Sequence, residues 1–204
     1  MEWQLRRNLM AKTEIYIYGA SGHGKVIADI ARDNGYKRIV FLDDNGNMKF
    51  SPCLPKADII IAIGDNFTRE KIQKKVTSAG FNVVNLIHSS AVVSKSAKFG
   101  KGIVVMPRAV INADAVIKDG AIINTGAVVE HDCIIGEFSH LSPNAAIAGG
   151  VIVGDRVHLG ILSAVIQQIT IGKNSKIGAG AAVIKDIPAD SVAVGVPAKV
   201  IHNI

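Results

Sequence analysis

The chain has 204 residues, a formal net charge of +6 and a hydrophobic fraction of 49%, which together exclude a disordered or fibrous protein. The basic residues are scattered, no apolar run is long enough to span a membrane, and the two cysteines lack the spacing of a metal site or a disulfide framework. We therefore expect a cytoplasmic protein with no membrane span and no nucleic-acid partner, and a polyanionic small molecule fits the positive charge equally well.

The first half of the chain is predicted to alternate strands and helices after residues 1–9, which fit no element. Strands are predicted over 14–18, 38–43, 58–63 and 82–87. One helix is expected to follow the first strand and to end at Gly35, and another carries Ile72 and Val76 on one face and stops at Gly80. This β-α-β order predicts an α/β domain of Rossmann-like type over residues 12–88.

A glycine-rich loop, Gly19 to Gly24, joins the first strand to the first helix. Backbone N–H groups at the positive end of a helix form a phosphate site. Asp43 follows Gly24 by nineteen residues, where a ribose-binding acid is expected. The glycine spacing differs from the dinucleotide fingerprint, and four strands are too few for both halves of a dinucleotide domain. A mononucleotide site is favoured, and a plain tight turn is the alternative.

From residue 91 to residue 186 the chain divides into sixteen hexads without an insertion, and the third residue of each hexad is apolar. Chance would give this pattern with a probability on the order of 10⁻⁵. The first position is mostly Ala or Ser, and Gly, Asn and Asp recur in the other half. Each hexad is predicted to be a short strand and a turn, so three hexads form one coil of a parallel β-helix over residues 89–204. The handedness does not follow from the pattern.

His131 lies in a hexad turn between Glu130 and Asp132. A carboxylate can hold one imidazole nitrogen and leave the other to accept a proton, as acyl transfer to an amine requires. A solvated turn histidine explains the same residues. His140 and His158 lie one coil apart and can stack, and His158 carries no predicted role. The H-x-x-x-x-H pair of β-helical zinc enzymes is absent, so no metal is expected.

Several motifs resemble the hexapeptide-repeat acyltransferases, closest to UDP-4-amino-sugar N-acetyltransferases of bacillosamine type. They are YIYGASGHGKV, FLDD, AIGDN, INTGAVVEHDCIIGEFSHLSP and the tail GVPAK, and the resemblance extends from Lys12 to Lys199. It implies a left-handed β-helix after the Rossmann-like domain, a homotrimer with active sites between subunits, and acetyl-CoA-dependent N-acetylation of a UDP-amino-sugar in bacterial glycan biosynthesis. Relatives that O-acetylate sialic acid or N-acetylate perosamine remain alternatives, and a non-enzymatic nucleotide-sugar sensor is a third.

The resemblance also implies roles for individual residues. His131 matches the general base, Asp132 the acid that orients it, and Gly149 the residue whose N–H meets the thioester carbonyl. The positions that match the sugar-nucleotide site are Ser21, Gly22, His23, Asp43, Asp44, Gly64, Asn66, Asn124 and His140. The positions that match acetyl-CoA contacts are His140, Gly149, Gly160, Ile161, Gly178, Ala179, Gly195 and Pro197.

Overall fold

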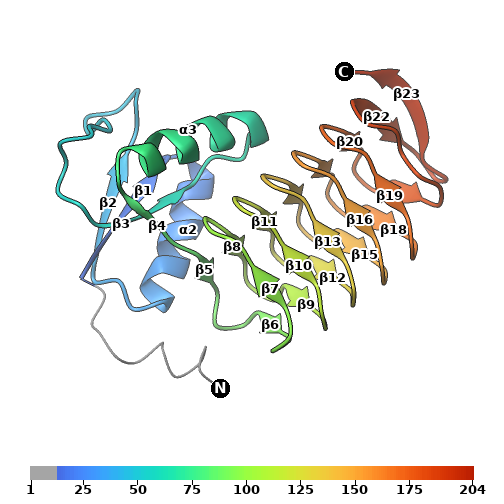
Figure 1. Cartoon of the computed structure of the whole chain (residues 1–204), viewed down its shortest axis with the longest axis horizontal. Helices are drawn as coiled ribbons and strands as arrows, with labels where there is room; N and C mark the ends of the chain where they lie inside the picture. The colour runs from blue at the N-terminus through green and yellow to red at the C-terminus, as the bar shows by residue number, and fades with distance from the viewer. Residues whose placement is uncertain (1–12) are drawn as a thin grey trace.

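The structure is a computed structural model that describes residues 13–204; residues 1–9 and the predicted domain start at residue 12 lie outside this range. A small α/β unit sits beside one end of a long stack of coils (Figure 1). No helix within residues 13–204 is long and apolar enough to cross a membrane.

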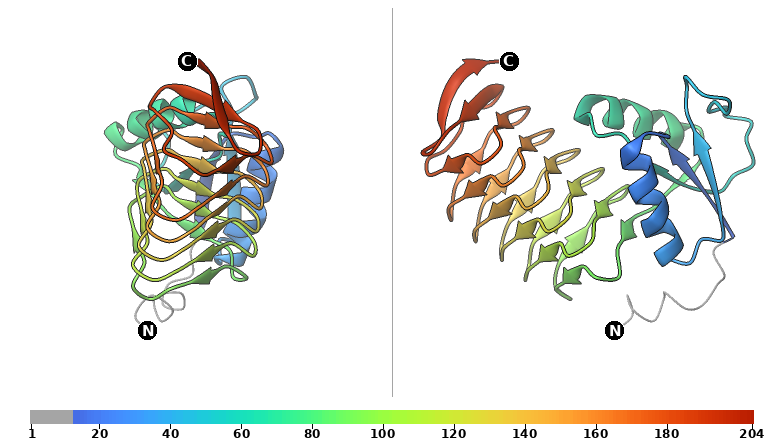
Figure 2. Two further views of the ribbon diagram at one scale, coloured as in Figure 1. Left: turned by 90° about the vertical axis from the view of Figure 1, so that its right-hand side faces the viewer. Right: turned by 180° about the vertical axis from the view of Figure 1, so that it is seen from behind.

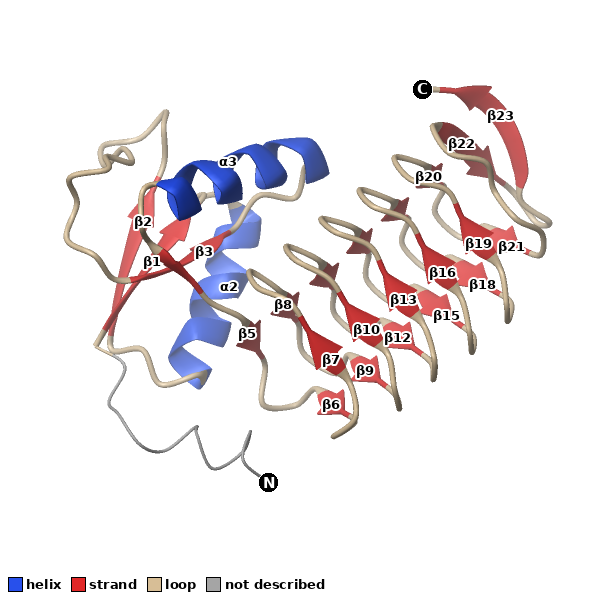
Figure 3. Ribbon diagram, in the orientation of Figure 1, coloured by secondary structure: helices blue, strands red, loops and turns tan. Residues whose placement is uncertain are grey.

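The α/β unit is a parallel sheet with two helices, coloured by type in Figure 3. Its strands run in the order β2-β1-β3-β4. Their bounds are β1 Glu14–Tyr18, β2 Arg38–Leu42, β3 Asp58–Ile61 and β4 Asn82–Val83. The helices are α2 Gly22–Asp33 and α3 Asn66–Ser78. The first three predicted strands and both predicted helices are therefore confirmed in order and type, with ends that shift by one or two residues.

The predicted strand 82–87 is wrong as a single strand. It divides into β4, which pairs with β3 of the α/β sheet, and β5 (Leu86–Ile87), which pairs with β8 of the stack. Asn85 lies between them and is held by the first coil: its Nδ2 donates to the Gly100 carbonyl at 2.7 Å, and its Oδ1 accepts from the Ile103 N–H at 2.9 Å. An apolar run alone could not show that the chain changes sheets here.

The stack is a left-handed parallel β-helix, in agreement with the resemblance. Its three sheets form the sides of a prism, seen along its length in the left view of Figure 2. The eight-stranded sheet has the order β23-β22-β20-β17-β14-β11-β8-β5, the six-stranded sheet β21-β18-β15-β12-β9-β6 and the five-stranded sheet β19-β16-β13-β10-β7. Its strands after β5 are β6 Val92–Val93, β7 Lys98–Phe99, β8 Val104–Val105, β9 Val110–Ile111, β10 Val116–Ile117, β11 Ile122–Ile123, β12 Val128–Val129, β13 Ile134–Ile135, β14 His140–Leu141, β15 Ala146–Ile147, β16 Ile152–Val153, β17 His158–Leu159, β18 Ala164–Val165, β19 Thr170–Ile171, β20 Lys176–Ile177, β21 Ala182–Val183, β22 Ser191–Val194 and β23 Lys199–Asn203.

Each position of the hexad has a distinct physical role. The third residue ends a two-residue strand and points into the core, as Ile123 and Leu141 do with no exposed surface. The first residue is small and buried at the corner, as at Ala127. Most sixth residues have positive φ, including bulky ones such as Phe138 at 55° and Leu162 at 58°. The left-handed turn is therefore not limited to Gly, Asn and Asp, because the coil imposes it.

Three corners of the prism are used below. The His131 corner (residues 130–132 and 148–150) leads from the six- to the five-stranded sheet. The Arg156 corner (118–120, 136–138 and 154–156) leads from the five- to the eight-stranded sheet, and the Ile161 corner (160–162 and 178–180) leads on to the six-stranded sheet.

The α/β unit packs on the outer face of the eight-stranded sheet. The outward residues Leu86, Val104 and Ile122 of this sheet share a buried cluster with Ile17 of β1 and Ile30 of α2. The next outward residues along the same face are His140, His158 and Lys176. The apolar part of this face holds the α/β unit, and the polar part continues beyond it.

Candidate active site

A pocket of about 320 Å³ opens at the carboxyl ends of β1 and β3. The chain reverses direction across the sheet at this point, because β2 lies on one side of β1 and β3 on the other, and ligands of parallel sheets bind at such a point. The lining includes four residues expected at a nucleotide, which are Ser21, Asp43, Asp44 and Gly64. Gly22 begins α2 beside it, so the positive end of that helix lies near the pocket.

Tyr18 ties one wall of this pocket together. Its hydroxyl hydrogen-bonds the Asp44 carboxylate, with both oxygens 2.7 Å away, and Lys75 Nζ lies 3.3 Å from the same hydroxyl. Burial and the Asp44 hydrogen bond raise the pKa of Tyr18. Asp43 accepts the N–H of Asn45 at 2.9 Å. Asp44 is therefore bound to the protein, and the contact with Tyr18 fixes its orientation.

Three histidines meet where the α/β unit joins the β-helix. The ring of His140 lies 5.0 Å from that of His158 and 6.4 Å from that of His23, centroid to centroid. His140 Nε2 lies 3.0 Å from Asn124 Nδ2, and His158 Nε2 lies 3.1 Å from Ser142 Oγ. The buried atoms His23 Nε2 and His140 Nδ1 have no hydrogen-bond partner within residues 13–204. The structure thus brings together His23, His140 and Asn124, which were expected at the sugar, and adds His158.

Burial keeps these histidines neutral. It lowers the pKa of His140 to about 3 and that of His23 to about 4, and it also lowers the pKa of His158. The positive charge of Arg69 acts in the same direction on all three. At neutral pH each ring therefore offers one donor and one acceptor nitrogen.

Arg69 of α3 joins the two parts of the chain. Its side chain is 1% exposed and donates to the carbonyls of Ile63 and Gly64 in the α/β unit and to those of Gly120 and Phe138 in the β-helix, at 2.6–3.0 Å. Burial lowers its pKa to about 9. These bonds fix the Gly64 loop against the Arg156 corner.

Asn66 also takes part in this junction. Its Nδ2 donates to the carbonyls of Arg156 and Val157, and its Oδ1 accepts from Arg69. Its polar atoms are thus bonded within the protein, although the residue also lines a second hollow with Phe67, His158 and Lys176.

His131, Asp132 and Gly149 form a compact group at the His131 corner. His131 Nδ1 lies 2.8 Å from Asp132 Oδ2, both side chains are about two-thirds exposed, and the hydrogen bond raises the pKa of His131. Asp132 has the left-handed φ of a sixth hexad position, 60°. A Cβ on Gly149 would lie 2.6 Å from His131 Nε2, so the imidazole lies against this glycine. The free Nε2 is the ring atom available to a substrate.

The residues expected at acetyl-CoA lie elsewhere, mostly along the Ile161 corner. Ile161 and Ala179 are exposed there, one coil apart. Gly160 and Gly178 have a packing reason of their own, because a Cβ on Gly160 would lie 2.6 Å from Ala179 N and one on Gly178 would lie 2.8 Å from Val194. Gly195 and Pro197 belong to the turn between β22 and β23.

The predicted site residues do not converge within one chain. The histidine cluster lies on the eight-stranded side of the prism, whereas the His131 corner joins the other two sides. In a three-sided prism, a corner lies opposite the side that does not form it. His131 therefore faces away from the pocket and from His140 of its own chain.

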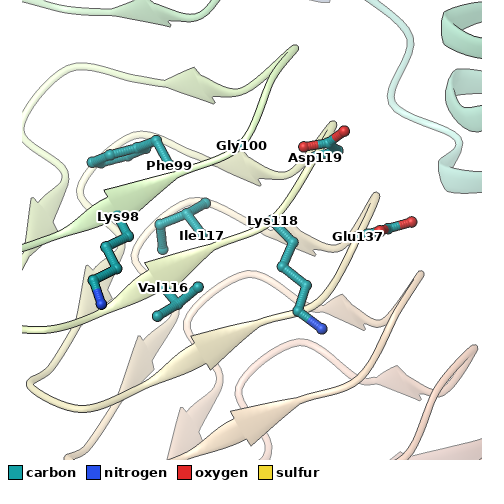
Figure 4. Close-up of a pocket in the computed structure, with 8 residues that line it drawn as sticks. All are labelled: Lys98, Phe99, Gly100, Val116, Ile117, Lys118, Asp119 and Glu137. Carbon is teal, nitrogen blue, oxygen red and sulfur yellow. The ribbon is translucent and has the colours of Figure 1, made fainter.

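A further hollow, of about 290 Å³, lies on the five-stranded sheet (Figure 4). Lys98 and Lys118 extend over it, and Asp119 and Glu137 lie at its edge. None of the expected site residues lines it. Among residues 13–204, no group of three or more His, Cys, Asp or Glu residues is arranged to hold a metal ion.

Tyr18 and Arg69 were not identified from the sequence. Tyr18 ends a predicted strand and precedes the glycine loop, a position from which it could have been suggested. Arg69 is one of several basic residues in a polar helix, and nothing in the local pattern marks it as buried.

The comparisons with known proteins agree on one kind of relative. Residues 14–76 match the PglD N-terminal domain. A crystal structure of PerB from Caulobacter crescentus, in complex with CoA and GDP-perosamine, is 42% identical with a TM-score of 0.89, over 93% of this chain and 97% of that one. The acetyltransferase domain of PglB from Neisseria gonorrhoeae, in complex with acetyl coenzyme A, is 38% identical with a TM-score of 0.87, over 92% and 98%.

A curated relative is UDP-N-acetylbacillosamine N-acetyltransferase of Bacillus subtilis. It is 41% identical over 109 residues, which is 45% of this chain. The match spans 50% of the length of that relative.

Proposed function

Because this chain belongs to the hexapeptide-repeat family of sugar N-acetyltransferases, we propose that it transfers the acetyl group of acetyl-CoA to the 4-amino group of a nucleotide-linked amino-deoxy sugar of the UDP-bacillosamine type. The observation that carries the proposal is the His131–Asp132 pair against Gly149, in a chain that matches 97% of a protein solved with CoA and a sugar nucleotide.

The α/β unit binds the nucleotide in this proposal. The pocket at β1 and β3 has the position of a mononucleotide site in a parallel sheet. Ser21 and Gly22 at the start of α2 contact the diphosphate, and Asp43 and Asp44 contact the nucleoside. The sugar then extends past Gly64 toward His140.

His131 acts as the general base. Asp132 holds Nδ1–H, so Nε2 accepts the proton that the sugar amine loses as its nitrogen bonds to the thioester carbon. The tetrahedral intermediate then collapses, the C–S bond breaks, and CoA leaves as the thiolate. The Gly149 N–H is suited to the oxyanion, because this glycine lies beside the imidazole that receives the proton.

We propose that the site is completed by a second chain in a homotrimer. The outward residues of the six-stranded sheet are all apolar and mostly small: Val92, Val110, Val128, Ala146, Ala164 and Ala182. A threefold contact over this sheet would set the His131 corner of one chain against the Ile161 corner of its neighbour. Acetyl-CoA would lie in that seam, along Gly160, Ile161, Gly178, Ala179, Gly195 and Pro197.

The function is tested by thiol release from acetyl-CoA with UDP- and GDP-linked 4-amino sugars. We expect release with the amino sugar nucleotides, a product that carries an amide, and none with sialic acid. Release with none of them contradicts the proposal. A sensor would show a thermal shift with sugar nucleotides and none with acetyl-CoA.

GDP-perosamine is the second candidate substrate. The specific observation in its favour is the structural relative that holds this compound and matches almost the whole chain. A comparison of kcat/KM for UDP- and GDP-linked substrates decides between them.

The shared site is tested by mixing two variants of low activity, His131→Ala and His140→Ala. Mixed trimers contain interfaces at which the His131 corner comes from one chain and His140 from the other, so some sites are intact. We expect activity to return on mixing after dissociation and reassembly. If the mixture is no more active than the two variants measured separately, while a wild-type sample treated in the same way recovers, each chain builds its own site.

A further inference from the structure

Asn124 has a side-chain amide whose orientation is determined by its own turn. The Oδ1 atom accepts the Thr125 N–H at 2.8 Å. If the amide were rotated by 180°, Nδ2 would face this N–H and two donors would meet. The amide nitrogen must therefore point to His140, as it does at 3.0 Å.

This orientation determines the tautomer of His140. An amide nitrogen carries only donors, so His140 Nε2 must accept, and the ring proton of neutral His140 must lie on Nδ1. His140 is 9% exposed, and its Nδ1 is buried without a partner among the described residues. The ring thus presents a donor that the protein leaves unpaired, and a buried unpaired donor is costly.

The surroundings of His140 favour the neutral ring. Burial is the largest cause that lowers the pKa of His140, and the charged groups His158 on β17, Arg69 on α3 and His23 on α2 lower it further. The Gly64 backbone acts in the opposite direction and is the smallest of these effects. Protonation would also place an N–H at Nε2 against the Asn124 amide. Both effects exclude the imidazolium form near neutral pH.

We propose that Asn124 is a positioning residue that holds His140 as a neutral Nδ1–H donor, and that this donor binds an acceptor oxygen of the bound substrates. The identity of the substrates rests on the proposed function above, and the tautomer does not. The acceptor is either an oxygen of the sugar nucleotide or the thioester carbonyl oxygen. His140 cannot take the proton of the amine at Nδ1, because that nitrogen is already protonated.

The tautomer is measured by long-range ¹H–¹⁵N NMR on the full-length protein with ¹⁵N-labelled histidine. The signals of His140 are assigned by their loss in His140→Asn. We expect Nδ1 protonated and Nε2 unprotonated in the wild type at pH 7. The opposite tautomer, or a doubly protonated ring, overturns the proposal, and this measurement requires no variant of Asn124.

Asn124→Asp separates positioning from support of the turn. A carboxylate accepts where the amide donates, so we expect the ring proton to move to Nε2 or the ring to become doubly protonated. Asn112→Asp is the matched control, because Asn112 is the same residue at the same hexad position in another corner, and it should leave the His140 signals unchanged. An Asn124→Asp protein with the wild-type His140 tautomer overturns the proposal.

The bound oxygen is identified by substitutions of His140. The Asn amide can place a donor near Nδ1, whereas the Gln amide reaches the position of Nε2. We expect His140→Asn to retain activity within about tenfold of wild type and His140→Gln and His140→Ala to lose roughly 10- to 100-fold. A rise in KM for the sugar nucleotide alone locates the oxygen there, and a fall in kcat with an unchanged KM locates it at the thioester.

The outcomes also separate this proposal from the proposed function. Equal activity of the three His140 variants overturns the role of the donor while leaving acetyl transfer intact. A wild-type protein without transferase activity overturns the proposed function, and the tautomer measurement then still tests the role of Asn124.

Discussion

At the scale of single residues, the His131 corner depends on the imidazole of His131 and on the lack of a side chain at Gly149. The fifth hexad position accepts Ala113, Asp155 and Lys173 in other coils, so the backbone does not require glycine there. At residue 149 a Cβ would meet the imidazole of His131. The family resemblance drew attention to Gly149 for its N–H, and the structure adds a steric reason for the same glycine.

Replacing His131 by Ala should lower kcat for acetyl transfer by roughly 10²- to 10⁴-fold, the span of a lost general base. Binding of acetyl-CoA, measured by calorimetry, should change little. Recovery of part of the rate at high pH is expected, because the substrate amine then needs no base. A turnover within about threefold of wild type across pH contradicts the catalytic assignment.

Asp132→Asn should shift the pH profile in a defined direction. The hydrogen bond to Asp132 raises the pKa of His131, and the base works only when it is deprotonated, so activity falls as pH drops through that pKa. Without the carboxylate, the acidic limb of the kcat profile should move to lower pH while the plateau falls. A plateau at the wild-type level, or a limb that moves to higher pH, contradicts this role.

Gly149→Ala should displace the imidazole and lower kcat by roughly tenfold or more, with the thermal midpoint close to wild type. The control is Ala113→Ser, one coil away from His131 in the same corner, which should retain activity. Circular dichroism and steady-state kinetics measure the two effects. Equal rates for Gly149→Ala and wild type would show that His131 has room to move aside.

At the scale of elements, the hexads could be predicted because the third residue of each one points into the core. A period of six without an insertion is typical of few folds other than a β-helix. The handedness came only from resemblance. The division of 82–87 into β4 and β5 and the burial of Arg69 could not be predicted, because both depend on contacts with distant coils through Asn85, Gly120 and Phe138.

Arg69→Met should loosen the α/β unit from the β-helix. Several buried carbonyls lose their donor, so we expect the free energy of unfolding to fall by about 2–4 kcal/mol. Hydrogen exchange in α3 should rise, and KM for the sugar nucleotide should increase. Arg32→Met is the control, because exposed Arg32 forms an ion pair with exposed Asp29 and its loss should change stability by less than about 0.5 kcal/mol. Similar exchange in α3 for both variants contradicts the role of Arg69.

Acid should weaken the same junction. In the folded protein the pKa of His140 is lowered to about 3 and that of His23 to about 4. The pKa of histidine in the unfolded chain is near 6.5, so below this pH the unfolded chain binds more protons than the folded protein. Stability should therefore fall as pH drops from about 6.5 toward 4. Differential scanning calorimetry should show a smaller fall for His140→Asn than for wild type. Parallel curves for the two proteins contradict this account.

At the scale of the whole molecule, the three sides of the prism have different outward residues. One side carries the α/β unit and the histidines. The five-stranded side has Lys98 and Thr170 at its ends with Val116, Ile134 and Ile152 between them, and the six-stranded sheet shows only Val and Ala. The sequence predicts these differences between the outward residues once the register is known, because residues six positions apart lie on neighbouring sides of the prism. It does not show that His131 lies opposite His140 until the corners are assigned.

Ala146→Glu, at the centre of the six-stranded sheet, should convert the proposed trimer to monomers and abolish transfer, because it puts a charge into the proposed contact. Light scattering gives the mass. Thr170→Glu, exposed on the five-stranded sheet, is the control and should stay trimeric. A wild-type monomer that retains activity, or an unchanged mass for Ala146→Glu, contradicts the shared site.

The eighteen-residue register also determines which changes in length evolution can accept. An inserted or deleted coil of eighteen residues leaves every later side chain on its own side of the prism, and only its height changes. A gain or loss of six residues between His131 and Gly149 would turn every later residue to the neighbouring side, and Gly149 would leave the imidazole. Length variants of this protein should therefore gain or lose whole coils on the C-terminal side of Gly149. They should have no insertion or deletion between His131 and Gly149.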